Sequence, residues 1–214
     1  MADKSGLTDD NAGYRFKQHE LPILPGSPAN PDHPAPRKVA YLLIGLFLGL
    51  VGGAQNGFLL ANTAALQGEM ALTPVQAGWI SVAFYSTYAC MSMLLFRVRQ
   101  EFGIQPFVKY AMIGLVAANL VQMLELGYYP EIAARAMAGI AASGLSALAI
   151  YYLMQGLPAS ARIGALILGI GLVQTAFPLA RAISPYLLVD GNISRAFQLQ
   201  FGLSLISLGA VYLL

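Results

Sequence analysis

Arg135 and Arg181 are charged side chains that stand inside long apolar runs of the sequence. At helical rise, each lies roughly 8 to 10 Å from the same end of its run, so the two guanidinium groups share a depth. An arginine within a membrane span costs about 2.5 kcal/mol or more at the centre, which makes both residues candidates for substrate binding or coupling. The alternatives are snorkelling to the interface and, for Arg135, an ion pair with Glu131 one helical turn earlier.

Amide side chains form a second set of candidate groups. Gln55 and Asn62 fall on one face of a helix, and Asn56 and Gln174 also lie within apolar runs. An uncharged amide at membrane depth needs a hydrogen-bond partner or a wet cavity. Hydrogen bonding between helices and the lining of a cavity both explain these four residues.

Three of these amides, Gln55, Asn56 and Asn62, share the first apolar run with a ridge of small residues. Glycine costs about 1 kcal/mol relative to alanine inside a helix, so a regular series of glycines indicates that something gains from the missing side chains. In lipid that gain is close approach between helices. The glycines at every fourth position are Gly45, Gly49, Gly53 and Gly57.

The composition of the chain indicates which kind of structure holds these residues in place. The chain is 57% hydrophobic and only 10% charged, with a mean hydropathy of +0.62, whereas about a quarter of the residues of soluble domains are charged. We therefore predict an all-α, polytopic membrane protein with six transmembrane helices and a disordered, proline-rich N-terminal tail over residues 1–36. The expected spans are 39–66, 74–96, 107–127, 130–154, 162–188 and 196–214, and Thr73 followed by Pro74 predicts the start of the second.

Lysine and arginine residues predict the orientation. They gather on alternate sides of the spans, and the poorer side carries Arg195 alone among acidic loops. The positive-inside rule then predicts a cytoplasmic N-terminus in a multi-pass protein of the cell (inner) membrane. The basic side holds Arg37, Lys38, Arg97, Arg99, Lys109 and Arg162.

Several kinds of chemistry are not expected. Ser143 and Gly144 resemble part of the serine motif of rhomboid proteases, but that chemistry needs a histidine, and His19 and His33 both lie in the tail. The membrane part offers one cysteine, Cys90, and no histidine, so we expect no metal site. We also expect no cofactor and no enzymatic activity. Scattered basic residues predict no nucleic-acid partner. The spans hold no clearly embedded Asp or Glu, so the sequence predicts no carboxylate proton relay.

The order of these features resembles the N-terminal six-helix half of a major facilitator superfamily transporter, and most closely the fourteen-span drug:proton antiporter branch. The resemblance covers about residues 40–214. Arg135 in ARAMAGIAASG matches the arginine of the family's fourth-span motif. In that family this arginine is associated with coupling proton movement to transport. The other positions that carry it are Trp79, Ile80 and Tyr85 in GWISVAFYSTYA, Gly103 with Arg97 and Arg99 in the cytoplasmic loop RVRQEFGIQPF, and Arg162 in PASARIGA.

The chain also departs from the family motifs. Asn56 stands where the drug exporters have a first-span aspartate, and Ser184 with Pro185 stands in place of the Gly-Pro pair of the fifth span. The aspartate, arginine and later basic residues of the cytoplasmic loop motif are replaced. The residues at those loop positions are Gln100, Glu101, Ile104 and Gln105.

The resemblance implies a secondary active transporter, or its N-terminal half, that exports a lipophilic or organic-anion compound by ion-coupled alternating access. Arg135 and Arg181 would make the outer end of a central cavity positive. The expected partners are the lipid bilayer, a small-molecule substrate, and a second six-helix half or a homodimer partner. The polar contacts would come from Gln55, Asn56, Asn62 and Gln174.

A function without transport is also compatible with the sequence. The altered loop motif and the missing carboxylate fit a non-transporting membrane assembly subunit. The run that ends at Leu214 has no polar residue to close the sixth span, so the chain is also expected to be half of something larger, or a truncated and inactive transporter fragment.

Overall fold

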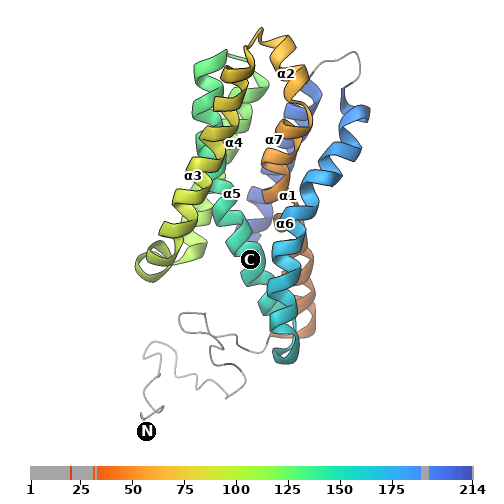
Figure 1. Ribbon diagram of the computed structural model, residues 1–214. Coiled ribbons are helices and arrows are strands. Elements are labelled where there is room, and N and C mark those ends of the chain that lie inside the picture. The colour runs from red at the N-terminus through yellow and green to blue at the C-terminus, as the bar shows by residue number, and fades with distance from the viewer. Residues whose placement is uncertain (1–19, 21–30, 32, 189–192, 214) are drawn as a thin grey trace.

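Helices account for the whole regular structure of the described residues. The computed structural model describes residues 20, 31, 33–188 and 193–213, and within these ranges it contains no strand. Six helices are long and apolar enough to cross a membrane, which confirms the predicted all-α, multi-pass fold. The elements in Figure 1 are α1 (Ala35–Ala61), α2 (Thr63–Glu69), α3 (Pro74–Glu101), α4 (Ile104–Met123), α5 (Tyr128–Gly156), η2 (Ala159–Ala161), α6 (Arg162–Leu187) and α7 (Ser194–Leu213).

Local chemistry explains where the helices begin. The predicted cap of α3 is confirmed: the Thr73 hydroxyl accepts from the Gln76 amide at 3.3 Å, and the Gln76 side chain accepts from the Thr73 amide at 2.9 Å. This reciprocal pair satisfies two amides that a helix start would leave without partners. Gly103 (φ 79°) precedes α4 and Gly127 (φ 106°) precedes α5, and both conformations favour glycine.

The helix boundaries differ from the expected spans by a few residues, and the largest differences are at the ends of the first two. The expected first span, 39–66, divides at Asn62, where α1 ends and the short α2 begins. The Asn62 side chain donates to the Phe58 carbonyl oxygen at 2.8 Å, so it competes with continuation of the helix. The second span is expected to end at residue 96, whereas the helix continues to Glu101, beyond the apolar part of its sequence. Most of the predicted tail, 1–36, lies outside the described residues.

The bundle has inner and outer helices. In their most apolar stretches, α5 and α1 are 67% and 56% buried, whereas α3 and α6 are 11% and 22% buried. α5 packs against α1, α3, α4 and α6, and α7 packs mainly on α4. In Figure 1, α3 and α6 lie on opposite sides with α1 and α5 between them. The outer helices therefore present most of their side chains to lipid or to a partner.

The glycine ridge of α1 lies where this helix meets its two neighbours. A Cβ on Gly45 would stand 3.1 Å from the Ala149 carbonyl oxygen on α5. A Cβ on Gly57 would stand 3.2 Å from the Ala176 carbonyl oxygen on α6. Such contacts are tighter than ordinary packing, so the glycines permit close approach of α1 to both helices. Gly53 faces the Val173 carbonyl oxygen on α6, and Gly49 faces the Leu172 side chain of the same helix.

Candidate functional site

A buried ion pair lies in the interior of the bundle. Arg135 on α5 is 0% exposed, and its Nε donates to Oε1 of Glu131 one turn earlier at 3.0 Å. Arg135 Nη1 also donates to the main-chain oxygen of Gln55 on α1 at 2.7 Å. A charge is tolerated in such a place only with a close partner and further hydrogen bonds. The predicted ion pair is therefore present, and it is part of a larger arrangement.

Amides from two more helices complete this cluster. Gln122 on α4 donates to Glu131 Oε1 at 3.0 Å. Asn119 on α4 donates to the Gln200 carbonyl oxygen on α7 at 3.2 Å. Gln200 Nε2 in turn lies 3.4 Å from the Gln55 carbonyl oxygen. The polar cluster thus joins α1, α4, α5 and α7, and its members are Gln55, Asn119, Gln122, Glu131, Arg135 and Gln200, all of them buried.

Glu131 corrects the expectation that no carboxylate is embedded. The sequence places it at the edge of the fourth span, yet the residue is only 4% exposed. It lies in the first turn of α5, where α4 and the Arg135 side chain cover it. An acid in the first turn of a helix also interacts favourably with the helix dipole. A titratable group therefore lies inside the described bundle.

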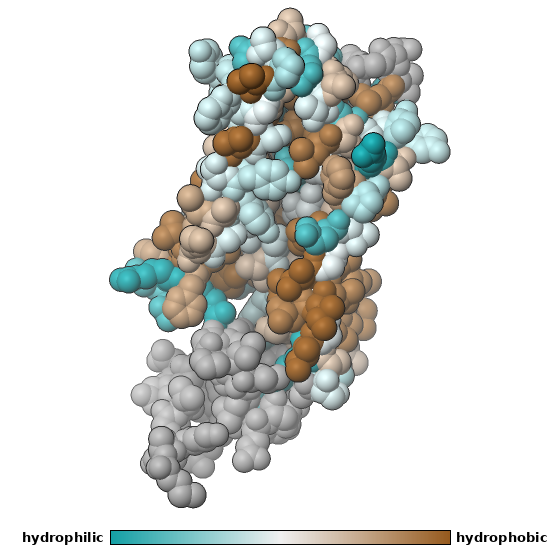
Figure 2. Space-filling model, in the orientation of Figure 1, coloured by the Kyte–Doolittle hydropathy of each residue, from teal (hydrophilic) through white to brown (hydrophobic). Residues whose placement is uncertain are grey.

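A groove between α1, α3 and α6 is the second candidate site. Its volume is about 460 Å³, which falls within the usual range for small-molecule pockets. Asn56 and Gln174 supply amides, and neither polar atom of the buried Asn56 side chain has a partner among the described residues. Figure 2 shows pale and teal residues interspersed with brown ones on the face that carries α3 and α6. The other lining residues are Gly52, Gly53, Gly57, Leu60, Phe84, Tyr85, Tyr88, Val173 and Phe177.

The structure separates residues that the sequence grouped together. Gln55 belongs to the polar cluster, whereas Asn56 faces the groove. Asn62 belongs to neither the polar cluster nor the groove. Its Oδ1 instead accepts a hydrogen bond from Ser184 on α6. Arg135 is paired inside the bundle, whereas Arg181 is exposed on α6. Two amides, Asn56 and Gln174, therefore share a pocket.

Three amides of the cluster were missed at the sequence level. Asn119 and Gln122 are one turn apart in an expected span, which places them on one helix face, and Gln200 lies in the last run. Polar residues at helical spacing within an apolar run are the signal that could have found the first two. No comparable pattern marks Gln200, because its partners come from other helices.

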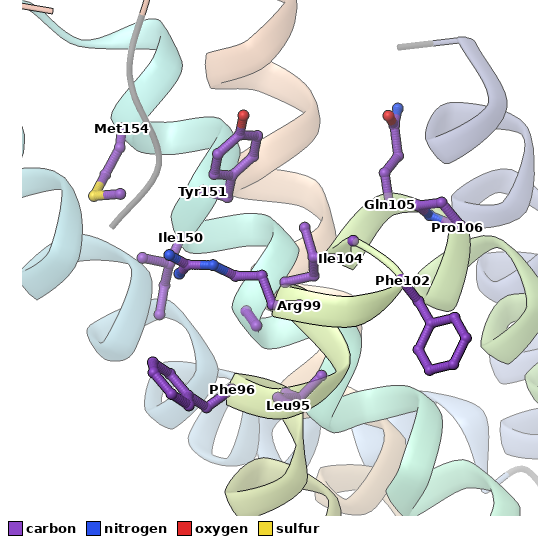
Figure 3. Close-up of a pocket in the computed structure, with 12 residues that line it drawn as sticks. Leu95, Phe96, Arg99, Phe102, Ile104, Gln105, Pro106, Ile150, Tyr151 and Met154 are labelled. Atoms are coloured by element: carbon purple, nitrogen blue, oxygen red, sulfur yellow. The ribbon is translucent and has the colours of Figure 1, made fainter. Parts of the chain in front are cut away.

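The basic loop borders a further cavity near the C-terminal end of α3. This cavity of about 730 Å³ is lined by α3, α4 and α5, and includes Arg99, Gly103, Ile150 and Tyr151. Figure 3 shows the Arg99 side chain extended from α3 toward Ile150, while Phe102 points away from it. Arg97 is turned elsewhere and pairs with the exposed Glu101 at 3.0 Å. The loop arginines thus have different environments.

Comparison with known proteins gives one distant similarity. No protein-family profile matches the chain. The MFS-type transporter ppz2 of Metarhizium majus (strain ARSEF 297) is 25% identical over 140 residues, which cover 63% of this chain and 23% of that protein. The chain thus spans less than a quarter of the length of this curated relative. Together with the six apolar helices, the similarity supports a membrane protein of the major facilitator type.

Proposed function

We propose that this chain forms a six-helix half of a secondary active transporter, and that the groove between α1, α3 and α6 binds its substrate. The groove itself carries this proposal. It combines aromatic walls with two amides, and two of the helices that border it, α3 and α6, are little buried. Pockets that bind small molecules are mostly apolar with a few placed polar groups. The similarity to an MFS-type transporter supports the same class of function.

An anionic or lipophilic substrate fits the charges near the groove. Gln174 and Phe177 line it, and Arg181 follows them on the same face of α6, at spacings of one and two turns. Arg181 is exposed, and no carboxylate of the described residues lines the groove. Arg135 contributes less positive charge there, because Glu131 neutralises it. Attraction in a low-dielectric groove then favours an organic anion.

Transport would need a second bundle. A groove that is open along one face becomes a two-sided pathway only when another set of helices covers it, either a further half or a second copy of this chain. Rocking of one bundle against the other would give alternating access. We propose export from the cytoplasm across the plasma (inner) membrane by ion-coupled antiport, with the N-terminus on the cytoplasmic side.

Transport of a charged probe tests this function. The full-length protein is reconstituted in vesicles. The flux of a fluorescent lipophilic anion is then compared with that of a lipophilic cation. We expect flux of the anion above that of protein-free vesicles, and a loss of about fivefold in Arg181→Gln, equivalent to about 1 kcal/mol of attraction.

Arg195→Gln is the matched control. Arg195 is an exposed arginine near the start of α7, on the same expected side of the membrane, and it does not line the groove. Its anion flux should match that of the wild type. Equal flux of anion and cation, or an equal loss in both arginine variants, would contradict an anion-binding groove. An absence of any specific flux would favour the non-transporting alternative.

A further inference from the structure

Asn56 is a buried amide in the wall of the groove between α1, α3 and α6. The residue is 5% exposed, and neither its Nδ2 nor its Oδ1 has a hydrogen-bond partner among the described residues. The other two amides of the first apolar run each accept a hydrogen bond from another helix, Gln55 from Asn119 and Asn62 from Ser184. Buried polar atoms are nearly always paired, so an unpartnered amide that borders a cavity points to a ligand.

The two unpartnered atoms define the chemistry of that ligand. Along one edge of the planar Asn56 amide, Nδ2 donates and Oδ1 accepts. A carboxylate could bind Nδ2 but would leave Oδ1 facing a negative charge, whereas an ammonium group could bind Oδ1 but would leave Nδ2 without an acceptor. A group that presents an N–H beside a C=O in one plane satisfies both atoms at once. Lactams and primary carboxamides have this arrangement.

Glycines and aromatic side chains shape the groove for a flat molecule. α1 contributes glycines next to Asn56, so its backbone rather than side chains forms that wall. On α3, Phe84 and Tyr88 lie with their ring planes 15° apart and their centroids 6.0 Å apart, and both line the groove. Phe177 lines it from α6. Stacking on such rings favours a planar aromatic ligand. The glycines are Gly52, Gly53 and Gly57.

We propose that the groove binds a planar aromatic lactam or carboxamide, which pairs with both polar atoms of Asn56 and carries an anionic substituent toward Arg181. This inference rests on the proposed function, because it names the class of substrate for that site. A Cβ on Gly57, the residue after Asn56, would stand 3.3 Å from the Phe177 Cα, so Asn56 and Phe177 lie at a similar height. Arg181 stands one turn beyond Phe177, about 6 Å along the helix axis. The amide edge and the anionic group of one bicyclic molecule can therefore reach both residues.

Isothermal titration calorimetry on the purified full-length protein tests this class with two ligands of the same shape and charge. The lactam is 2-quinolone-4-carboxylate. Its control is the lactone coumarin-4-carboxylate, in which an oxygen atom replaces the N–H. We expect the lactam to bind about tenfold more tightly, equivalent to about 1.4 kcal/mol, because the lactone leaves the Asn56 Oδ1 without a donor.

Substitution of Asn56 shows whether this residue causes the preference. Asn56→Leu removes both polar atoms and keeps a side chain of similar volume. The lactam should lose its advantage, whereas lactone binding should be retained, which also shows that the groove has formed. If Asn56→Leu fails to fold, Asn56→Ala is the second variant, and it should remove the preference in the same way. Gln198→Leu is the matched control, since Gln198 is an exposed amide on α7 outside the groove, and it should keep the full preference.

Equal affinities of the two ligands for the wild type would overturn the proposal, as would a preference that persists in Asn56→Leu, because a water molecule would then suffice as the partner of Asn56. A lack of binding by both ligands would also overturn it. Arg181→Gln should weaken both ligands equally, since both carry the same carboxylate. Anion flux without a lactam preference would contradict only this inference. A preference that depends on Asn56 in a protein without flux would support the site and contradict only the transport function.

Discussion

Arg135 on α5 donates to the main-chain oxygen of Gln55 on α1 at 2.7 Å, so the buried ion pair is held against the helix that borders the groove. The two candidate sites are separated by a single peptide unit, because Asn56 faces the groove while Gln55 faces the cluster. A change at one site therefore has a direct route to the other through α1. Substitutions in the ion pair, the glycine ridge and the groove separate the contributions of these parts.

Loss of Glu131 should destabilise the protein strongly. Glu131→Gln leaves the Arg135 guanidinium buried without an anionic partner, and breaking a buried pair from one side costs about 3 to 5 kcal/mol. We expect the free energy of unfolding in lipid to fall by about that amount, and E131Q/R135Q to recover part of it. Trp79 is the single tryptophan, so its emission can follow unfolding.

The exposed pair of α3 provides the comparison. Glu101→Gln removes an ion pair of the same type, whose side chains are 78% and 52% exposed, and such surface pairs contribute about 0 to 1 kcal/mol. The two glutamate variants should therefore differ clearly in stability. Equal effects would show that the Glu131 pair is not shielded from solvent.

The glycine ridge should tolerate no side chain where α1 meets α6. A Cβ on Gly53 would meet the Val173 carbonyl oxygen and the Ala176 side chain, so Gly53→Ala must push the helices apart. Overpacking of this kind costs about 1 to 3 kcal/mol. Gly78→Ala on α3 is the control, because among the described residues the added carbon has no neighbour within 4 Å beyond the adjacent turns of its own helix. The better helix propensity of alanine should leave stability unchanged or higher by up to about 1 kcal/mol. Thermal unfolding of both variants checks the difference.

The raised pKa of Glu125 predicts that the stability of the protein falls as pH rises. Burial and the neighbouring Glu69 raise the pKa of Glu125 above its ordinary value of 4.5, so the folded state binds this proton more tightly than the unfolded chain. Stability therefore decreases as pH rises from that ordinary value through the raised one, and the penalty is complete above it. Glu125→Gln should raise the unfolding temperature at neutral pH and flatten this dependence. An unchanged pH profile would show that Glu125 does not contribute.

The membrane helices follow directly from the sequence. Long uncharged runs separated by polar turns can satisfy their backbone only as helices, so the number of spans is determined by composition. The Glu131 and Arg135 spacing likewise predicts their pairing within one helix. Features of this kind depend on neighbours in the chain, and local rules describe them well.

Contacts between helices were less predictable. Gln55 and Asn62 share a helix face by spacing, but one joins the polar cluster and the other binds Ser184. That difference depends on which helix lies opposite each turn of α1. The burial of Glu131 has the same origin, because α4 covers the start of α5 only in the folded bundle.

The most direct test of the central claim is binding of a lipophilic organic anion to the groove. Tyr85 lines it from α3, whereas Tyr110 on α4 is also exposed but does not line it, so Tyr85→Ala and Tyr110→Ala form a matched pair. Titration of a fluorescent anion into the purified full-length protein should show saturable binding, weakened about tenfold in Tyr85→Ala, or about 1.4 kcal/mol, and unchanged in Tyr110→Ala. Unchanged binding in Tyr85→Ala, or an equal loss in both variants, would contradict a substrate site between α1, α3 and α6.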